Sequence, residues 1–389
     1  MGRRVVSILH YSALPVIGGV ELTLDTHAKL LRNHNFEVRI IAGDGNPDVL
    51  IPELKSSYYG EMSKEILKAK TPGDFDSEVS KVEEKILKNL KDSDVLIVHN
   101  LFTMHFNLVA TAALTKISKK IKTIGWVHDL SYVDPTYGLP PPGNSPLKFI
   151  ASSTPGIKWV TITNYRKNLL SDFFNIEKND IEVINNGIDP YVILSPDMKK
   201  AAEELKILSY YPVALFPSRL TRRKNFELAI DITSKLKGNP LLLLSAPPDP
   251  HNPAFLNYKN ELKKRAKEKG VKMIMFAQYC PIKDIETFYF LGDFLLITSK
   301  MEGFGLPAIE ASLFRMPAAL SNIPPLREIE KHFQSHIFFD LDEKPTKIAK
   351  NIDKFLKQNK IVQDRRTIID NFSWDSILEN KLIPLINAI

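Results

Sequence analysis

The sequence predicts an α/β protein made of two doubly wound domains that face a cleft. Short apolar runs of β type alternate along the chain with stretches whose apolar residues recur at helical spacing, a pattern typical of parallel sheets covered by helices on both faces. The alternation starts again after Asp197, and a segment rich in Asn, Gly, Asp and Pro at residues 185–196 separates the two series. We therefore expect two Rossmann-like domains, over residues 1–193 and 194–371, with ligands bound at the carboxyl ends of their strands.

The individual elements follow from the apolar runs and their period. Strands of the first domain are expected at residues 5–10, 37–42, 95–99, 123–128, 159–163 and 182–184, with helices between them, for example at 21–32, 77–90 and 106–117. Strands of the second domain are expected at residues 213–217, 241–245, 272–276, 294–298 and 318–320, and helices at 226–236, 255–267, 284–290 and 308–314.

The composition is that of an ordinary globular protein, with 44% hydrophobic and 25% charged residues. A single cysteine, Cys280, excludes an internal disulfide and favours a reducing, cytoplasmic setting. No apolar run approaches the roughly 20 residues of a membrane helix, and the apolar start of the chain is interpreted as a strand because it is too short for a leader. The net charge of +7 comes largely from lysines spread over helices such as residues 261–269, so we expect solvated faces and no nucleic acid.

The most informative segment is a pair of glutamates, Glu302 and Glu310, around a Gly-Phe-Gly-Leu-Pro turn between a predicted strand and a predicted helix. Gly303 and Gly305 allow a sharp turn and a close approach of the backbone to a ligand, and Pro307 suits the first turn of a helix. Free N–H groups at such a helix start favour a phosphate. Carboxylates accept hydrogen bonds from paired hydroxyls and repel phosphates, so they should flank a diphosphate, with Glu302 toward a sugar and Glu310 toward a ribose.

This nonapeptide resembles the E-x7-E signature of retaining nucleotide-sugar glycosyltransferases, in particular glycosyltransferase family 4 of the GT-B fold. Two glutamates alone at this spacing would usually mark a solvated face, and the glycine-rich insert makes the signal specific. The resemblance implies transfer of a hexose, mannose or glucose, from a GDP-, UDP- or ADP-linked donor to an acceptor hydroxyl, with retention and without a cofactor. It implies donor-binding roles for Gly303, Phe304, Gly305, Leu306 and Glu310 and a catalytic role for Glu302. The acceptor stays open among a glycan, a lipid-linked sugar and a small polyol.

Four cations follow the first strand of the second domain. The segment at residues 217–225 resembles the family pattern G-R-L-x-x-x-K-G, with Arg219 and Lys224 in the diphosphate-binding places. Fixed cations stabilise the charge that grows on a leaving nucleoside diphosphate. Ser218 and Asn225 stand where the family has glycines. A basic surface helix start is the alternative, and the helix dipole disfavours it. We expect no metal, because the chain lacks a D-x-D pair in a strand-end loop.

His128 ends a strand of the first domain in the segment Trp-Val-His-Asp. The resemblance puts this histidine against the donor sugar, whereas a lone histidine after a strand is often structural. Asp129 could orient its ring or cap the next turn. Gly18 and Gly19 resemble the family's Gly-Gly loop, which lies near the phosphate and the acceptor. The loop is not G-x-G-x-x-G, and no P-loop motif occurs, so a nicotinamide enzyme or a P-loop ATPase is not expected.

The resemblance extends along nearly the whole chain, from Gly18 to Trp374. Gln278 and Tyr279 lie where the family holds the nucleotide base by backbone contacts, and Gln278 replaces a common glycine, which leaves the base open. Residues 372–389 resemble the last helix, which crosses back to the first domain. The basic segment 116–122 matches a region that touches anionic lipid in some relatives, so peripheral contact with a cytoplasmic membrane face stays open, although a solvated helix end is favoured. Two alternatives remain, a non-catalytic sugar-nucleotide-binding protein and a sugar-nucleotide epimerase.

Overall fold

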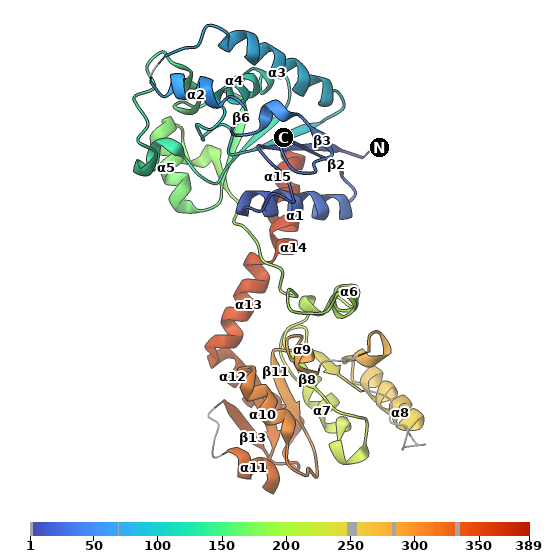
Figure 1. Cartoon of the computed structure of the whole chain (residues 1–389). Coiled ribbons are helices and arrows are strands. Elements are labelled where there is room, and N and C mark those ends of the chain that lie inside the picture. Colours follow the sequence, from blue (N-terminus) through green and yellow to red (C-terminus); the bar gives the residue numbers. More distant parts are fainter. Residues whose placement is uncertain (1–2, 69, 247–254, 282–284, 331–334) are drawn as a thin grey trace. The chain divides into compact units, whose positions relative to one another are not determined.

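The computed structural model describes residues 3–68, 70–246, 255–281, 285–330 and 335–389. The chain forms two compact units, one made of Met1–Ile188 with Asn371–Ile389 and the other of Asp189–Asp370 (Figure 1). The boundaries expected between the two Rossmann-like domains, at 193/194, and before the C-terminal segment, at 371/372, stay a prediction. Each unit has its own parallel sheet, which confirms the predicted α/β class.

The sheet of the N-terminal unit has seven described strands in the order β3-β2-β1-β4-β5-β6-β7, paired in parallel throughout. The strands are β1 Val5–His10, β2 Glu37–Ala42, β3 Val49–Leu50, β4 Val95–His99, β5 Thr123–Val127, β6 Ile157–Thr161 and β7 Ile181–Val183. The longer helices are α1 Gly19–Asn33, α2 Gly60–Ile66, α3 Phe75–Asn89, α4 Leu108–Ile117 and α5 Asn164–Phe174. Strand order reverses between β1 and β4, and in doubly wound sheets ligands bind outside the carboxyl ends of the strands at such a switch point.

Both faces of this sheet are buried, because successive side chains of a strand point to opposite sides. Leu96 and Val98 of β4 face a core formed with α3, α4 and α5, whereas Val95 and Ile97 face a core formed with α1 and the C-terminal segment. That segment comprises α14 Trp374–Ile377, a π-helical turn Leu378–Leu382 and α15 Ile383–Ala388, and it packs on the N-terminal unit beside α1 (Figure 1). The C-terminal segment therefore contributes to the hydrophobic core of the N-terminal unit.

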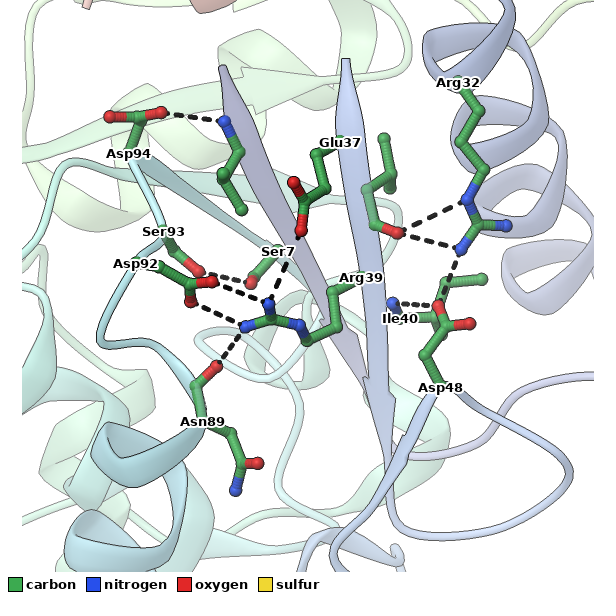
Figure 2. A network of polar contacts seen from close by, with 12 residues as sticks. Ser7, Arg32, Glu37, Arg39, Ile40, Asp48, Asn89, Asp92, Ser93 and Asp94 are labelled. Carbon is green, nitrogen blue, oxygen red and sulfur yellow. Dashed lines mark hydrogen bonds and ion pairs between the residues drawn. The ribbon is translucent and has the colours of Figure 1, made fainter. Parts of the chain in front are cut away.

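Ion pairs and hydrogen bonds join the amino-terminal ends of the first strands, away from the edge where ligands bind in such folds. Arg39 on β2 donates from Nη1 and Nη2 to the two carboxylate oxygens of Asp92, both at 2.9 Å, and from Nη1 to the carbonyl of Asn89 at 2.8 Å (Figure 2). The carboxylate of Asp94 accepts from the backbone N–H of Val5 at 2.7 Å. The hydrogen bond from Arg39 lowers the pKa of Asp92 to about 2. The loop between α3 and β4 is thus tied to β1 and β2.

The sheet of the C-terminal unit has six described strands in the order β10-β9-β8-β11-β12-β13, also parallel. They are β8 Val213–Phe216, β9 Leu241–Leu244, β10 Lys272–Met275, β11 Phe294–Ile297, β12 Ala318–Ser321 and β13 His336–Phe339. The helices are α6 Pro196–Glu204, α7 Phe226–Thr233, α8 Phe255–Glu268, α9 Ile285–Tyr289, α10 Leu306–Leu313, α11 Pro324–Glu330, α12 Pro345–Gln358 and α13 Lys360–Phe372. Because β8 and β11 are neighbours, the loops that follow them lie side by side at the carboxyl edge.

The expected elements are present with small shifts at their ends, but four helices of the C-terminal series, α6, α11, α12 and α13, were not among the expected ones. The edge strands β3 and β13 were not expected, since two residues give no period and the apolar run of β13 is short. The strand expected at residues 159–163 lies at Ile157–Thr161, because the side chain of Thr163 instead caps α5 by accepting from the backbone N–H of Arg166. The helix expected at 284–290 begins, in the described part, at Ile285, and residue 284 lies outside the described residues.

Candidate active site

The loop after β8 carries the predicted cations and has a defined backbone. A short 3-10 turn, Arg222–Lys224, leads into α7 through Asn225, which adopts the left-handed conformation with φ 56°. Asn is one of the few residues that enters this region readily, so it can serve where the family has glycine. The hydroxyl of Thr298, directly after β11, donates to the carbonyls of Lys224 at 3.0 Å and Asn225 at 2.8 Å. These bonds hold the two strand-end loops together.

Lys224 and Glu302, both predicted to face a ligand, are each other's partner. Lys224 Nζ lies 2.6 Å from Glu302 Oε1 and 2.8 Å from Oε2, and the Ser299 hydroxyl donates to Oε1 at 2.6 Å. The side chains of the pair are only 10% and 7% exposed. Arg223 Nη1 lies 3.9 Å from Glu302 Oε2. The carboxylate is therefore oriented by three groups, and the ammonium charge of Lys224 is largely neutralised before any ligand arrives.

Arg219 differs from Lys224 in its surroundings. It lies exposed in the loop between β8 and α7, and its guanidinium has no ion-pair or hydrogen-bond partner among the described residues. A cation held on a strand-end loop without a counter-charge is available to an anionic ligand. Of the two predicted diphosphate-binding cations, Arg219 is the one whose charge is free.

The Gly-Phe-Gly turn precedes α10 as expected. Gly305 has φ +100° as the cap of this helix, and a Cβ there would lie 2.6 Å from Leu326 Cδ2, so only glycine fits. Within the described part of the chain, the backbone N–H groups of Gly303, Phe304 and Gly305 donate to no acceptor. Phe304 and Leu306 are exposed. Free N–H groups at a helix start are a suitable site for a phosphate.

Glu310, one turn into α10, is held by a residue that sequence reasoning missed. The Tyr289 hydroxyl at the end of α9 donates to Glu310 Oε2 at 2.6 Å, and the tyrosine ring is buried. Burial, followed by the bond to Glu310, raises the pKa of Tyr289, so the hydroxyl keeps its proton and remains a donor. One oxygen of Glu310 is thus fixed, and Oε1 accepts from no other described residue.

The predicted base-binding residues lie in the turn after β10. Gln278 ends the 3-10 turn Phe276–Gln278, and Tyr279 follows it; both side chains are exposed. The turn is held to the end of β9 by a hydrogen bond from the Ala277 backbone N–H to the carbonyl of Ser245, at 3.1 Å. This turn lies at the same carboxyl edge as the cation loop, because β10, β9 and β8 are consecutive in the sheet.

In the N-terminal unit, the Gly-Gly loop leads into α1. A Cβ on Gly18 would overlap the carboxylate of Glu21, whereas Gly19 has open space around it. The Ser12 hydroxyl donates to Glu21 Oε1 at 2.6 Å, and His10 Nε2 lies 3.7 Å from the same oxygen. Glycine at position 18 therefore leaves room for the buried carboxylate of Glu21, a group that was not among the predicted site residues.

His128 is buried and held on both its backbone and its ring. Its backbone N–H donates to Asn100 Oδ1 at 2.8 Å, and its ring Nε2 lies 3.0 Å from His99 Nδ1. Burial lowers the pKa of His128 to about 3, so the ring is neutral near pH 7. Asp129 instead pairs with Arg166, with 2.9 Å between Oδ1 and Nη2. The ring contact of His128 comes from His99, not from Asp129.

Neither a metal centre nor a membrane span is evident in the described residues. No three of their His, Cys, Asp and Glu side chains are arranged to hold a metal ion. Across the same part of the chain, no helix combines the length and the apolar character needed to cross a membrane.

Two family models match successive parts of this chain. The model described as Glycosyltransferase Family 4 matches residues 17–191, and the one described as Glycosyl transferases group 1 matches residues 197–372. The chain belongs to glycosyltransferase family 4. As a family 4 glycosyltransferase it has the GT-B fold, with one matched region in each unit.

Curated relatives of this family 4 glycosyltransferase include two enzymes named mannosylglucosylglycerate synthase. The protein from Petrotoga mobilis is 27% identical over 371 residues, covering 82% of this chain and 82% of the relative. The protein from Thermotoga maritima is 26% identical over 357 residues, covering 81% and 80%. Among solved structures, Anabaena HepE in complex with UDP and glucose is 17% identical and covers 100% of each chain, with a TM-score of 0.38.

Proposed function

We propose that this protein is a retaining, metal-independent hexosyltransferase that moves mannose from a nucleoside diphosphate donor to a hydroxyl of a small acceptor. The observation that carries the proposal is the carboxyl edge of the C-terminal sheet. There the free cation Arg219, the Lys224–Glu302 pair and the unpaired N–H groups before α10 follow two adjacent strands, and Glu310 lies one turn further on. Positive groups for a diphosphate are flanked by carboxylates for hydroxyls, the arrangement that a sugar nucleotide requires.

The donor nucleotide is recognised by three features in this proposal. Arg219 and the N–H groups of residues 303–306 bind the diphosphate, and Glu310 accepts from the ribose hydroxyls while Tyr289 holds its other oxygen. Gln278 and Tyr279 contact the base through their exposed turn. Donors with guanine, uracil and adenine bases are compared in the experiment below.

The chemistry proposed needs no metal. The bond between the anomeric carbon and the phosphate oxygen breaks, and the bond to the acceptor oxygen forms on the same face of the sugar. The acceptor's proton passes to the leaving phosphate. Glu302 stabilises the positive charge that develops on the sugar, and Lys224 and Arg219 stabilise the negative charge on the leaving group. His128 of the N-terminal unit contributes a contact to the donor sugar.

The names of the relatives support the choice of substrates. Two relatives named mannosylglucosylglycerate synthase favour mannose as the transferred sugar and a small glycosylated hydroxy acid, such as glucosylglycerate, as the acceptor. Residues 1–193 and 194–371 are assigned to the acceptor and the donor, respectively. A cytoplasmic setting suits the single, buried thiol of Cys280.

Release of nucleoside diphosphate tests the proposal. The protein is incubated with GDP-mannose, UDP-glucose or ADP-glucose, with and without glucosylglycerate or glycerate, and with Arg219→Ala as the matched control. Release of nucleoside diphosphate that needs both donor and acceptor is expected. Conversion of the donor sugar without an acceptor would indicate the epimerase, and tight nucleotide binding with no turnover on any pair would indicate the non-catalytic binding protein.

A further inference from the structure

A stack of buried rings lies at the carboxyl edge of the N-terminal sheet. His99, the last residue of β4, stacks on His128 with ring centroids 5.3 Å apart and on Trp126 of β5 at 5.4 Å. His27 of α1 lies against Trp126, with centroids 4.8 Å apart. His99 and His27 are fully buried, and burial lowers the pKa of each, so neither ring carries a charge near pH 7. Each neutral ring therefore has one N–H and one bare nitrogen.

The contact between His99 and His128 has two chemically distinct forms. His99 Nδ1 and His128 Nε2 are 3.0 Å apart, and one hydrogen must lie between them. If His99 donates, His128 is the Nδ1–H tautomer and offers a donor on its other nitrogen. If His128 donates, its Nδ1 is bare and offers an acceptor, and His99 must carry its hydrogen on Nε2.

The surroundings of His99 favour one of these two tautomeric arrangements. His99 Nε2 is buried and has no hydrogen-bond partner among the described residues. A buried N–H without an acceptor is rarer in proteins than a bare acceptor, which favours a bare Nε2. The stacked neighbour Trp126 also has its indole N–H buried without a described partner, and an indole can only donate. Trp126 Nε1 and His99 Nε2 are not hydrogen-bonded to each other, so a bare Nε2 on His99 avoids adding a further unpaired donor to this stack.

We propose that His99 is a positioning residue that fixes His128 as its Nδ1–H tautomer, so that His128 meets its ligand as a hydrogen-bond donor. The backbone of His128 is already anchored by Asn100, so the hydrogen bond from His99 sets the remaining freedom, the ring's orientation and its hydrogen. His128 Nδ1 makes no hydrogen bond to any described residue, which leaves it available. The assignment of a sugar hydroxyl as the ligand rests on the proposed function; the tautomer does not.

NMR of protein labelled with ¹⁵N-histidine reads the tautomer directly. Nine histidines contribute signals, and His128→Gln identifies those of His128. In a long-range proton–nitrogen spectrum near pH 7, the coupling pattern of the carbon-bound ring protons tells Nδ1 from Nε2. We expect a protonated Nδ1 and a bare Nε2 on His128. A protonated Nε2 on His128 of the wild-type protein would overturn the proposal.

Two substitutions of His99 separate positioning from packing. His99→Phe keeps a ring stacked against Trp126 and removes the donor, whereas His99→Asn keeps an amide donor near the place of Nδ1 and removes the ring. We expect His99→Phe, which leaves His128 Nε2 without its described partner, to release the ring so that both tautomers of His128 are observed, and to lower kcat by about 10- to 100-fold, the scale seen when the partner that orients a functional histidine is lost. His99→Asn should keep most of the turnover although it is the less stable of the two variants.

A purely structural role would give the opposite order, with the less stable His99→Asn the less active. That order, or an unchanged tautomer in His99→Phe, would contradict the proposal. If no donor and acceptor pair turns over at all, the proposed function fails while the NMR result still decides the tautomer.

Discussion

Removing Lys224 should destabilise the C-terminal unit as well as slow the reaction. Lys224→Ala leaves the carboxylate of Glu302, 7% exposed, without its main counter-charge. Loss of one partner of a buried ion pair costs about 3–5 kcal/mol. Ser299 still donates to Glu302 at 2.6 Å and Arg223 lies 3.9 Å away, so we expect the lower end, about 3 kcal/mol. The double variant Lys224→Met with Glu302→Gln removes both charges at similar volume and should recover most of that loss.

The three tryptophans give this experiment an internal control. Trp126, Trp159 and Trp374 all lie in the N-terminal unit, so tryptophan fluorescence follows that unit while far-ultraviolet circular dichroism follows both. In a urea titration, Lys224→Ala should lower the midpoint seen by circular dichroism, and the double variant should restore it. A midpoint equal to wild type in Lys224→Ala, or a double variant no more stable than Lys224→Ala, would refute the view that the pair is coupled and buried.

Three further predictions concern groups in different settings. Arg219→Ala should change the free energy of unfolding by less than about 0.5 kcal/mol, because the side chain is exposed, yet lower turnover about 100-fold or more; a near-wild-type rate of nucleoside diphosphate release would place the diphosphate elsewhere. Tyr289→Phe should free the Glu310 carboxylate and reduce the preference for a nucleoside diphosphate over its 2′-deoxy analogue, measured by calorimetry; an unchanged ratio would separate the tyrosine from ribose binding. Burial lowers the pKa of His27 from 6.5 in the unfolded chain to about 4 in the folded protein. The ring is therefore largely neutral in both the folded and the unfolded protein above pH 6.5, and as the pH falls the unfolded chain binds the proton first. Between pH 7 and pH 5, protonation of His27 in the unfolded chain lowers the free energy of unfolding by about 2 kcal/mol. The variant His27→Met should lack this part of the loss when unfolding is followed by tryptophan fluorescence. Equal losses in the wild-type protein and the variant would contradict the prediction.

The fold could be predicted because it depends on local periodicity. Each interior strand is a short apolar run, and helices with one apolar face separate the runs, so the α/β class follows without any long-range information. The edge strand β13 escaped notice because only one of its four residues, Phe339, is buried. Several strands were expected to end one or two residues later than they do. Buried residues such as Thr298 continue the buried run beyond the end of the strand, so the sequence does not mark the end.

The site could be predicted in its residues but not in its contacts. Lys224 and Glu302 stand 78 positions apart, and only the pairing of β8 with β11 brings them together. The bond from Tyr289 to Glu310 likewise depends on how α9 packs beside α10. His99 could have been suspected, since it ends the strand beside the one that leads to His128, and strand ends of one parallel sheet share an edge. Its ring contact and its orphaned nitrogen, however, are properties of the packed core.

Transfer of the sugar, followed by anomeric analysis of the product by NMR in excess EDTA, tests the central claim most directly. Donor GDP-mannose and acceptor glucosylglycerate are the first pair, with UDP-glucose and ADP-glucose as the other donors. The account predicts release of nucleoside diphosphate at an undiminished rate in the chelator and an α-linked product from the α-linked donor. A β-linked product, or activity lost in EDTA and restored only by a divalent ion, would contradict it.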